Sequence, residues 1–164
     1  MGITVDLLIF YGKINVGIQK GGITVISFVS DSTLKTEEFA EKIGKSLRGG
    51  TVIAFFGGLG AGKTSFTRGL ARGMGIKSDV SSPTFAIVND YGGNPPLVHF
   101  DMYKVETWDD LYSSGFFDYL DMGAVLAVEW SENIENALPE STYFIEINRI
   151  DDTTREIIIR GNNI

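Results

Sequence analysis

A run of ten residues, GGLGAGKTSF at positions 57 to 66, combines closely spaced glycines with a lysine and two hydroxyl side chains. Glycine permits backbone angles that turn successive N–H groups toward one point, and such a nest of donors binds anions. A lysine beside the nest can reach the β- and γ-phosphates of a nucleotide, and the next hydroxyl can ligate Mg²⁺. The run therefore predicts a site for nucleotide phosphates and a magnesium ion.

The run fits a known spacing, because Gly57 to Thr64 match the pattern G-x-x-x-x-G-K-[ST] in full. Before it stands TVIAFF, residues 51–56, an apolar run of the kind found in strands buried on both faces of a parallel sheet. After it, Phe66, Leu70 and Met74 recur at helical spacing. Strand, glycine loop and amphipathic helix are the context that the motif requires, with Lys63 and Thr64 as its chemical groups.

Two further apolar runs each end on a carboxylate: LVHFD on Asp101 and AVLAVE on Glu129. Ligands of open α/β sheets bind at the carboxyl ends of the strands. We expect Asp101 to support the magnesium ion, against the alternative of a helix or turn cap. Glu129 is expected to ligate Mg²⁺ or to orient the attacking water, against the alternative of a solvated carboxylate. His99, the only histidine, stands between apolar neighbours and is expected to be packed in the interior.

The remaining elements predict an α/β fold, a P-loop NTPase-like three-layer sandwich with a mostly parallel central sheet and an antiparallel edge hairpin. TEEFAEKIGKSL, residues 36–47, predicts a helix capped by Thr36. TWDDLYSSGFFDYL, residues 107–120, predicts one helix that begins with a Thr107–Asp110 capping box. TYFIEI and REIIIR, on either side of IDDTT, predict the hairpin.

Two parts of the chain have less regular patterns, the amino-terminal segment and the loop after the first crossover helix. We expect residues 1–24 to form an amino-terminal extension of uncertain structure and residues 25–164 to form a single P-loop ATPase domain, with short strands at 3–10, 14–18 and 23–29. Ser82, Pro83 and Thr84 form a stiff loop after the first crossover helix. That loop is either a nucleotide-responsive switch or a plain turn before a strand.

Composition restricts the classes of partner. The chain of 164 residues carries a net charge of −7, and its 14 basic residues are scattered, so strong unassisted binding to tRNA or DNA is not expected. There is no cysteine to support a disulfide or a Cys-ligated metal site. Asp6, Lys13 and Lys20 divide the apolar first 30 residues into runs too short to span a membrane.

Three classes of phosphate-loop protein remain to be compared. A GTPase would carry [NT]-K-x-D, and the nearest string, Ile76 to Asp79, has the wrong first residue and lies too close to the loop. A small-metabolite kinase would bring arginines from a lid, yet no arginine occurs between Arg72 and Arg149. That class is weakened and stays open. The third class is an ATPase that acts through a protein partner, and a nucleotide-dependent binding module without turnover stays open beside it.

Four segments in order carry a resemblance: GGLGAGKTSFTRGLARGMGI, SSPTFAIVNDY, HFDMYKVE and EWSENIENALPE. Together they resemble the TsaE (YjeE) family, the ATPase component of bacterial tRNA threonylcarbamoyladenosine synthesis, over residues 30 to 160. The resemblance implies a cytoplasmic protein that binds ATP (or ADP) and Mg²⁺ and acts on the TsaD and TsaB proteins. Contact with tRNA would be indirect, through that complex, and no membrane would be involved.

The resemblance also implies roles for individual residues. Thr64 and Glu129 would hold Mg²⁺, and Asp101 and Glu129 would be the catalytic carboxylates. Residues expected to contact the nucleotide are Thr33, Gly58, Leu59, Gly60, Ala61, Gly62, Lys63, Thr64, Ser65, Glu132 and Arg155. Trp130 would flank the site.

Two features depart from that family. Its second loop position usually carries an acidic or amide side chain, whereas this chain has Gly58, so slower hydrolysis is expected. Residues 1–24 have no counterpart in it.

Overall fold

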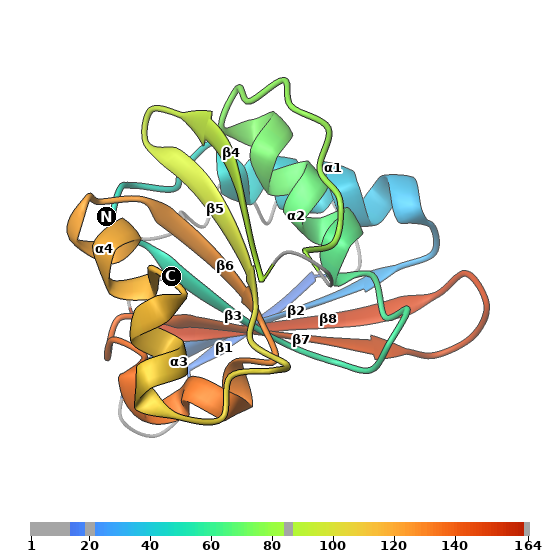
Figure 1. The fold of residues 1–164 in the computed structure, drawn as a ribbon. Coiled ribbons are helices and arrows are strands. Elements are labelled where there is room, and N and C mark those ends of the chain that lie inside the picture. Colours follow the sequence, from blue (N-terminus) through green and yellow to red (C-terminus); the bar gives the residue numbers. More distant parts are fainter. Residues whose placement is uncertain (1–13, 19–21, 84–86, 163–164) are drawn as a thin grey trace.

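The computed structural model describes residues 14–18, 22–83 and 87–162 (Figure 1). Within these ranges the strands form one eight-stranded sheet in the order β1-β2-β8-β7-β3-β6-β5-β4. The strands are β1 Ile14–Ile18, β2 Ile23–Ser30, β3 Val52–Phe56, β4 Val88–Gly93, β5 Pro96–Asp101, β6 Val125–Glu129, β7 Tyr143–Arg149 and β8 Arg155–Asn162.

The sheet has a parallel centre. Strand β3 pairs in parallel with both β6 and β7, and β6 pairs in parallel with β5. On one side β7 and β8 form the expected antiparallel hairpin, which β2 and β1 extend. On the other side β4 is an antiparallel edge strand against β5. The predicted fold class is confirmed, and the antiparallel part is larger than one hairpin.

Helices lie on both faces of the sheet, which gives three layers (Figure 1). One face carries α1 (Thr33–Gly44) and α2 (Lys63–Gly73), which pack against each other. The opposite face carries α3 (Trp108–Ser113), α4 (Phe116–Asp121) and the short 3₁₀ segment η2 (Ser131–Ala137). In the part of the chain that the structure describes, no helix has the length and apolar character needed to cross a bilayer.

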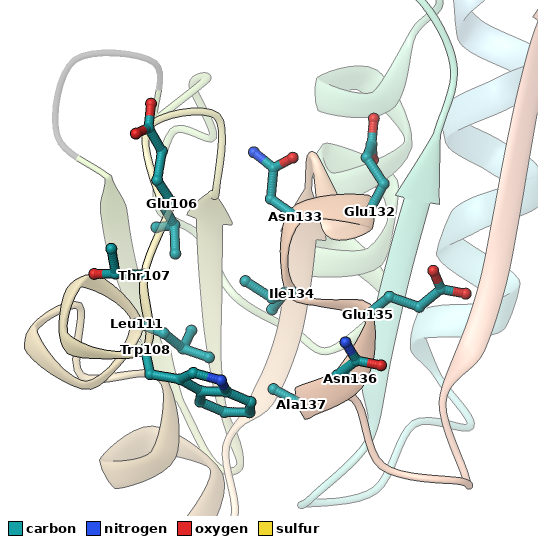
Figure 2. A pocket seen from close by; sticks show the side chains of 11 residues that line it. Glu106, Thr107, Trp108, Leu111, Glu132, Asn133, Ile134, Glu135, Asn136 and Ala137 are labelled. Atoms are coloured by element: carbon teal, nitrogen blue, oxygen red, sulfur yellow. The ribbon is translucent and has the colours of Figure 1, made fainter.

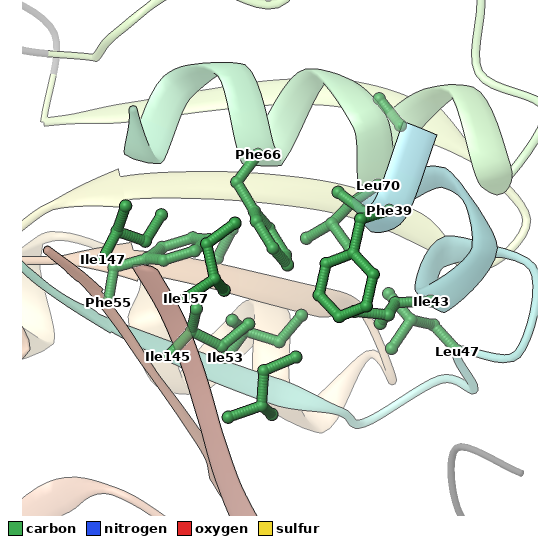
Figure 3. Packing of buried hydrophobic residues seen from close by; sticks show 14 of the residues in the cluster. Phe39, Ile43, Leu47, Ile53, Phe55, Phe66, Leu70, Ile145, Ile147 and Ile157 are labelled. Atoms are coloured by element: carbon green, nitrogen blue, oxygen red, sulfur yellow. The ribbon is translucent and has the colours of Figure 1, made fainter. Parts of the chain in front are cut away.

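The larger apolar core lies between α1, α2 and the sheet (Figure 3). Phe66 of α2 is fully buried and meets the rings of Phe39 and Phe55 edge-on, with centroids 6.3 and 5.7 Å apart. Edge-to-face aromatic pairs add stability beyond their buried area. Because Phe66 is three residues beyond Lys63, this packing fixes the start of α2 and therefore the glycine loop before it.

Glycines allow α1 and α2 to approach closely. A Cβ added at Gly69 would lie 2.3 Å from the Glu37 carbonyl oxygen, and one at Gly73 would lie 2.1 Å from that of Glu41. Real Cβ atoms do not come so near, so larger residues would force the helices apart. At the rim of this contact, Arg68 pairs with Glu37 at 2.7 Å and Arg72 pairs with Glu41 at 2.6 Å.

Two predicted helix boundaries were wrong. Helix α1 begins at Thr33, because the Ser32 hydroxyl accepts the Lys35 N–H and caps it, whereas Thr36 is buried and donates to the Ser30 hydroxyl. The helix predicted over residues 107–120 is broken into α3 and α4 at Gly115, whose φ of 80° is left-handed. Such a residue ends a helix, so the chain turns between the two segments.

Other expectations are confirmed. The capping box is formed, with the Asp110 N–H donating to Thr107 Oγ1 and Asp110 accepting the Thr107 N–H. The strands expected at 14–18 and 23–29 are β1 and β2, so the expected division after residue 24 falls inside β2. The strand expected at 3–10 lies outside the described residues.

Candidate functional site

The glycine loop connects the end of β3 to the first residue of α2. Gly57, Gly60 and Gly62 have φ values of 138°, 73° and 114°, which L side chains rarely adopt. A Cβ at Gly57 would also lie 2.6 Å from the Ile147 carbonyl oxygen. Helix α2 starts at this loop without a side-chain cap, so its first N–H groups and its dipole are directed to whatever occupies the loop. This geometry suits an anion.

Lys63 lies at the centre of the loop with only 8% of its surface exposed. Its Nζ donates to the carbonyl oxygens of Gly57 and Gly58 at 2.8 and 3.1 Å. It also lies 3.8 Å from Oε2 of Glu129. A buried ammonium held by carbonyl groups is a strong partner for phosphate oxygens, because little water competes for it.

A cavity of about 530 Å³ lies over the loop and collects the predicted chemical groups. Asp101 and Glu129 come from the ends of β5 and β6, where they are register partners, and each is 7% exposed. The cavity is lined by Leu59, Gly60, Ala61, Gly62, Lys63, Thr64, Ser65, Ser82, Asp101, Tyr103, Glu129 and Trp130. The structure thus brings together the loop and both strand-end carboxylates.

Asp101 has a structural bond as well as a place in the cavity. Its Oδ1 accepts the Tyr103 N–H at 2.9 Å, so the turn-cap alternative is realised. A carboxylate has several lone pairs, and this bond is compatible with a second contact to a metal-bound water.

The cavity offers oxygen donors, which Mg²⁺ prefers. Thr64 of α2 and Glu129 of β6 both line it. Among the described residues, those of this cavity included, no group of three or more His, Cys, Asp or Glu side chains could hold a metal ion by itself. The donor set therefore fits an ion that is completed by phosphate oxygens and water.

A second cavity of about 250 Å³ also borders the loop. Thr33 and Arg155 line it together with Gly60 to Gly62. Arg155 Nε donates to the Ala61 carbonyl oxygen at 2.9 Å, and Arg155 Nη1 donates to that of Asp151 at 2.8 Å. The start of α1 and the β7–β8 turn thus meet the glycine loop, although they are far from it in sequence.

Glu132 does not join these cavities. It lies on η2 and lines a separate hollow of about 190 Å³, with Glu106 and Glu135 also at its edge (Figure 2). Leu111 and Ile134 lie deeper in this hollow. Of the residues predicted to contact the nucleotide, Glu132 lies apart in this hollow, and Gly58 belongs to the glycine loop but lines neither of the two cavities beside it.

Two loops complete the rim of the larger cavity. Ser82 lines it, and Thr84 lies outside the described residues. Trp130 also lines it, with a left-handed φ of 55° and its ring 4.8 Å from that of Tyr103. Left-handed backbone at a bulky residue is costly and is found preferentially at functional sites.

His99 was assigned by sequence reasoning to the interior, and it is fully buried. Its surroundings are polar, however: Nε2 is 3.0 Å from Glu129 Oε1, and Nδ1 is 3.4 Å from the Tyr91 hydroxyl oxygen. A signal was present in the sequence, because residues two apart in a strand share a face and His99 is two residues before Asp101.

Known proteins are similar to this chain over most of its length. Residues 30–157 match the model of the family described as threonylcarbamoyl adenosine biosynthesis protein TsaE. A tRNA threonylcarbamoyladenosine biosynthesis protein TsaE from Treponema pallidum is 35% identical over 131 residues, which are 80% of this chain and 97% of that protein. Its counterpart from Bacillus subtilis is 40% identical over 124 residues, or 75% of this chain and 77% of the relative.

Among solved structures, the crystal structure of YdiB from Bacillus subtilis is similar, with a TM-score of 0.73 and 31% identity. The similarity covers 87% of this chain and 88% of that one.

Proposed function

The chain belongs to the TsaE family, and from this premise and the geometry of its glycine loop we propose that it is a Mg²⁺-dependent ATP-binding and ATP-hydrolysing subunit. Its task would be in threonylcarbamoyl modification of the tRNA adenosine next to the anticodon. The observation that carries the proposal is the convergence of Lys63, Thr64 and Glu129 on one cavity at the start of α2.

Each residue has a distinct part in the proposed reaction. The N–H groups of the loop and the Lys63 ammonium bind the β- and γ-phosphates and stabilise the charge on them as the γ-phosphoryl group leaves. Thr64 and Glu129 would hold Mg²⁺, which neutralises phosphate charge when bound. Asp101 would orient the water that attacks the γ-phosphorus or would support the ion. The bond between that phosphorus and the β–γ bridging oxygen breaks, and the products are ADP and phosphate.

The second cavity supports the remaining contacts. Thr33 and Arg155 line the second cavity, which shares residues 60–62 of the loop with the larger one, and from there they would contact the nucleotide. Arg155 is already oriented by its bonds to Ala61 and Asp151.

The proposal includes partners. The family resemblance supports an action on the TsaD and TsaB proteins in the cytoplasm, where hydrolysis would reset the complex between rounds of transfer. The chain itself would transfer no threonylcarbamoyl group. Its net charge of −7 agrees with a contact to tRNA that is indirect.

The decisive experiment measures phosphate release from Mg-ATP by the purified protein, alone and with TsaB, TsaD and tRNA. We expect release that rises with the partners. Lys63→Ala should lower release at least about tenfold, because each ~1.4 kcal/mol of lost transition-state stabilisation is tenfold in rate. Lys77→Ala, which removes the same charge from an exposed loop, is the matched control and should change little.

Two results would contradict the proposal. ATP consumption that depends on an added metabolite and yields a phosphorylated product would make the protein a small-metabolite kinase. Nucleotide binding without release under any condition would make it a binding module, for which the absence of a side chain at Gly58 would be a reason.

A further inference from the structure

A row of polar side chains lies behind the larger cavity, and in it Glu129 and His99 are buried while Tyr91 is half-buried. Glu129 has two carboxylate oxygens with different surroundings. Oε2 is directed to the glycine loop, 3.8 Å from Lys63 Nζ, while Oε1 is directed into the sheet, 3.0 Å from His99 Nε2. Because a carboxylate oxygen accepts hydrogen bonds, His99 must carry its proton on Nε2 to donate to it.

His99 itself is held firmly. It lies inside β5, paired across the sheet with Asn89 of β4 and Ala127 of β6, and none of its surface is exposed. Its second ring nitrogen faces the Tyr91 hydroxyl, which in turn donates to the Ser81 carbonyl oxygen at 2.7 Å. The imidazole therefore has a fixed plane, and its Nε2 has a fixed direction.

We propose that His99 is a positioning residue that holds Glu129 Oε1 so that Oε2 is presented to the phosphate site. This rests on the proposed function, in which Glu129 holds Mg²⁺. A Glu side chain has three rotatable bonds, and without the bond from His99 its carboxylate would sample orientations that do not serve the ion. Side chains that orient metal ligands typically change metal affinity or activity by about 10- to 100-fold when they are removed.

The same row reaches the loop that lines the cavity. Ser81, whose carbonyl oxygen accepts from Tyr91, is the neighbour of Ser82, which lies on the cavity wall. Tyr91→Phe removes this hydroxyl and leaves the His99–Glu129 bond in place. Its effect should therefore be smaller than that of removing the imidazole.

The test uses two substitutions of similar size at His99. His99→Leu removes the donor, and His99→Gln keeps an N–H near the position of Nε2. Binding of a fluorescent ATP analogue is measured with Mg²⁺ and with a chelator. The measured quantity is the factor by which Mg²⁺ increases the affinity for the analogue. We expect His99→Leu to reduce this factor about tenfold or more, with the affinity in chelator nearly unchanged. His99→Gln should restore part of the factor.

A double-mutant cycle separates positioning from general damage. Glu129→Gln by itself should abolish the increase in affinity that Mg²⁺ causes. Adding His99→Leu to this variant should reduce the affinity little further, because the imidazole acts through that carboxylate. Thermal unfolding checks that each variant is folded. Additive losses, or His99→Leu binding that responds to Mg²⁺ as the parent does, would overturn the proposal.

A measurement without nucleotide covers the case in which His99→Leu does not fold. Because the chain has one histidine, every imidazole signal in a nuclear magnetic resonance spectrum comes from His99. We expect a solvent-protected N–H signal that shifts in Glu129→Gln. An unchanged signal would mean that the bond does not exist. A shifted signal together with a Glu129→Gln variant that still responds to Mg²⁺ would remove both the metal-binding role of Glu129 and the purpose of its positioning.

Discussion

Neighbouring glycines in the loop are not equivalent. Gly57 has a left-handed φ and no room for a Cβ, because the Ile147 carbonyl oxygen lies 2.6 Å from where that atom would be. Gly58 has an ordinary φ and open space around it. Gly57 is therefore required by the conformation of the backbone. At position 58 the structure has room for a side chain, although the sequence has glycine there.

Gly58→Glu tests this difference. The new carboxylate would lie beside the phosphate site without disturbing the loop and could orient the attacking water, so we expect phosphate release to increase by about tenfold, or ~1.4 kcal/mol of barrier. The melting temperature should stay the same. Gly57→Ala is the contrasting variant and should lose both stability and nucleotide binding. A Gly58→Glu protein that is folded and no faster would show that the missing side chain does not limit the rate.

The β7–β8 hairpin is the element that brings Arg155 to the glycine loop, and its turn is built around Asp151. The carboxylate accepts the N–H groups of Thr153 and Thr154 at 2.8 and 2.7 Å. These bonds lower the pKa of Asp151 from 3.8 to about 2. The Asp151 carbonyl oxygen accepts from Arg155, so the turn also sets the direction of that guanidinium.

The lowered pKa predicts how the stability of this turn depends on pH. The ionised carboxylate binds the two N–H groups best, so its contribution is complete above pH 3.8 and is lost as the pH falls through about 2. Asp151→Asn should therefore have a lower free energy of unfolding than the parent at neutral pH. The difference between the two proteins should become smaller as the pH falls from 3.8 to about 2. Urea unfolding at a series of pH values measures it. Asp121→Asn, at the exposed end of α4, removes the same charge outside this turn and is the matched control for the substitution. A difference in the free energy of unfolding that is independent of pH would contradict the role given to the ionised Asp151 carboxylate.

In the whole molecule, the site lies at the carboxyl ends of the parallel strands of the central sheet. The carboxyl ends of β3, β5 and β6 supply the loop, Asp101 and Glu129, and the antiparallel strands widen the sheet that supports them. Strand β1 is outermost and mostly exposed, whereas β8 lies between β2 and β7. These strands should therefore contribute very differently to folding.

Truncation from each end tests that difference and the expected division of the chain. A chain of residues 22–164 keeps β2 and should bind Mg-ATP within about twofold of the parent, a change of ~0.4 kcal/mol. It should be modestly less stable and more prone to associate, because β2 becomes an edge strand. A chain of residues 1–154 lacks β8 and should not fold. Nucleotide binding that disappears with residues 1–21 would show that they belong to the functional domain.

Much of the site was predictable because it is local. One strand-loop-helix unit contains the spaced glycines, Lys63 and Thr64. Asp101 and Glu129 each end an apolar run, and parallel strands have their carboxyl ends on the same side of the sheet. Periodicity also predicted the β7–β8 hairpin, and residue types predicted the Thr107–Asp110 cap.

The tertiary structure decided what depends on contacts between distant segments. Ser32 and not Thr36 caps α1, because Thr36 is turned into the interior to bond Ser30. Arg155 reaches Ala61 across 94 residues, Glu132 lies in another hollow, and His99 acquires its partner only where β5 and β6 pair. Local patterns specify the types of the chemical groups, since these follow from short-range geometry. Which of them touch follows from strand order and register, and these are set by the packing of the whole sheet.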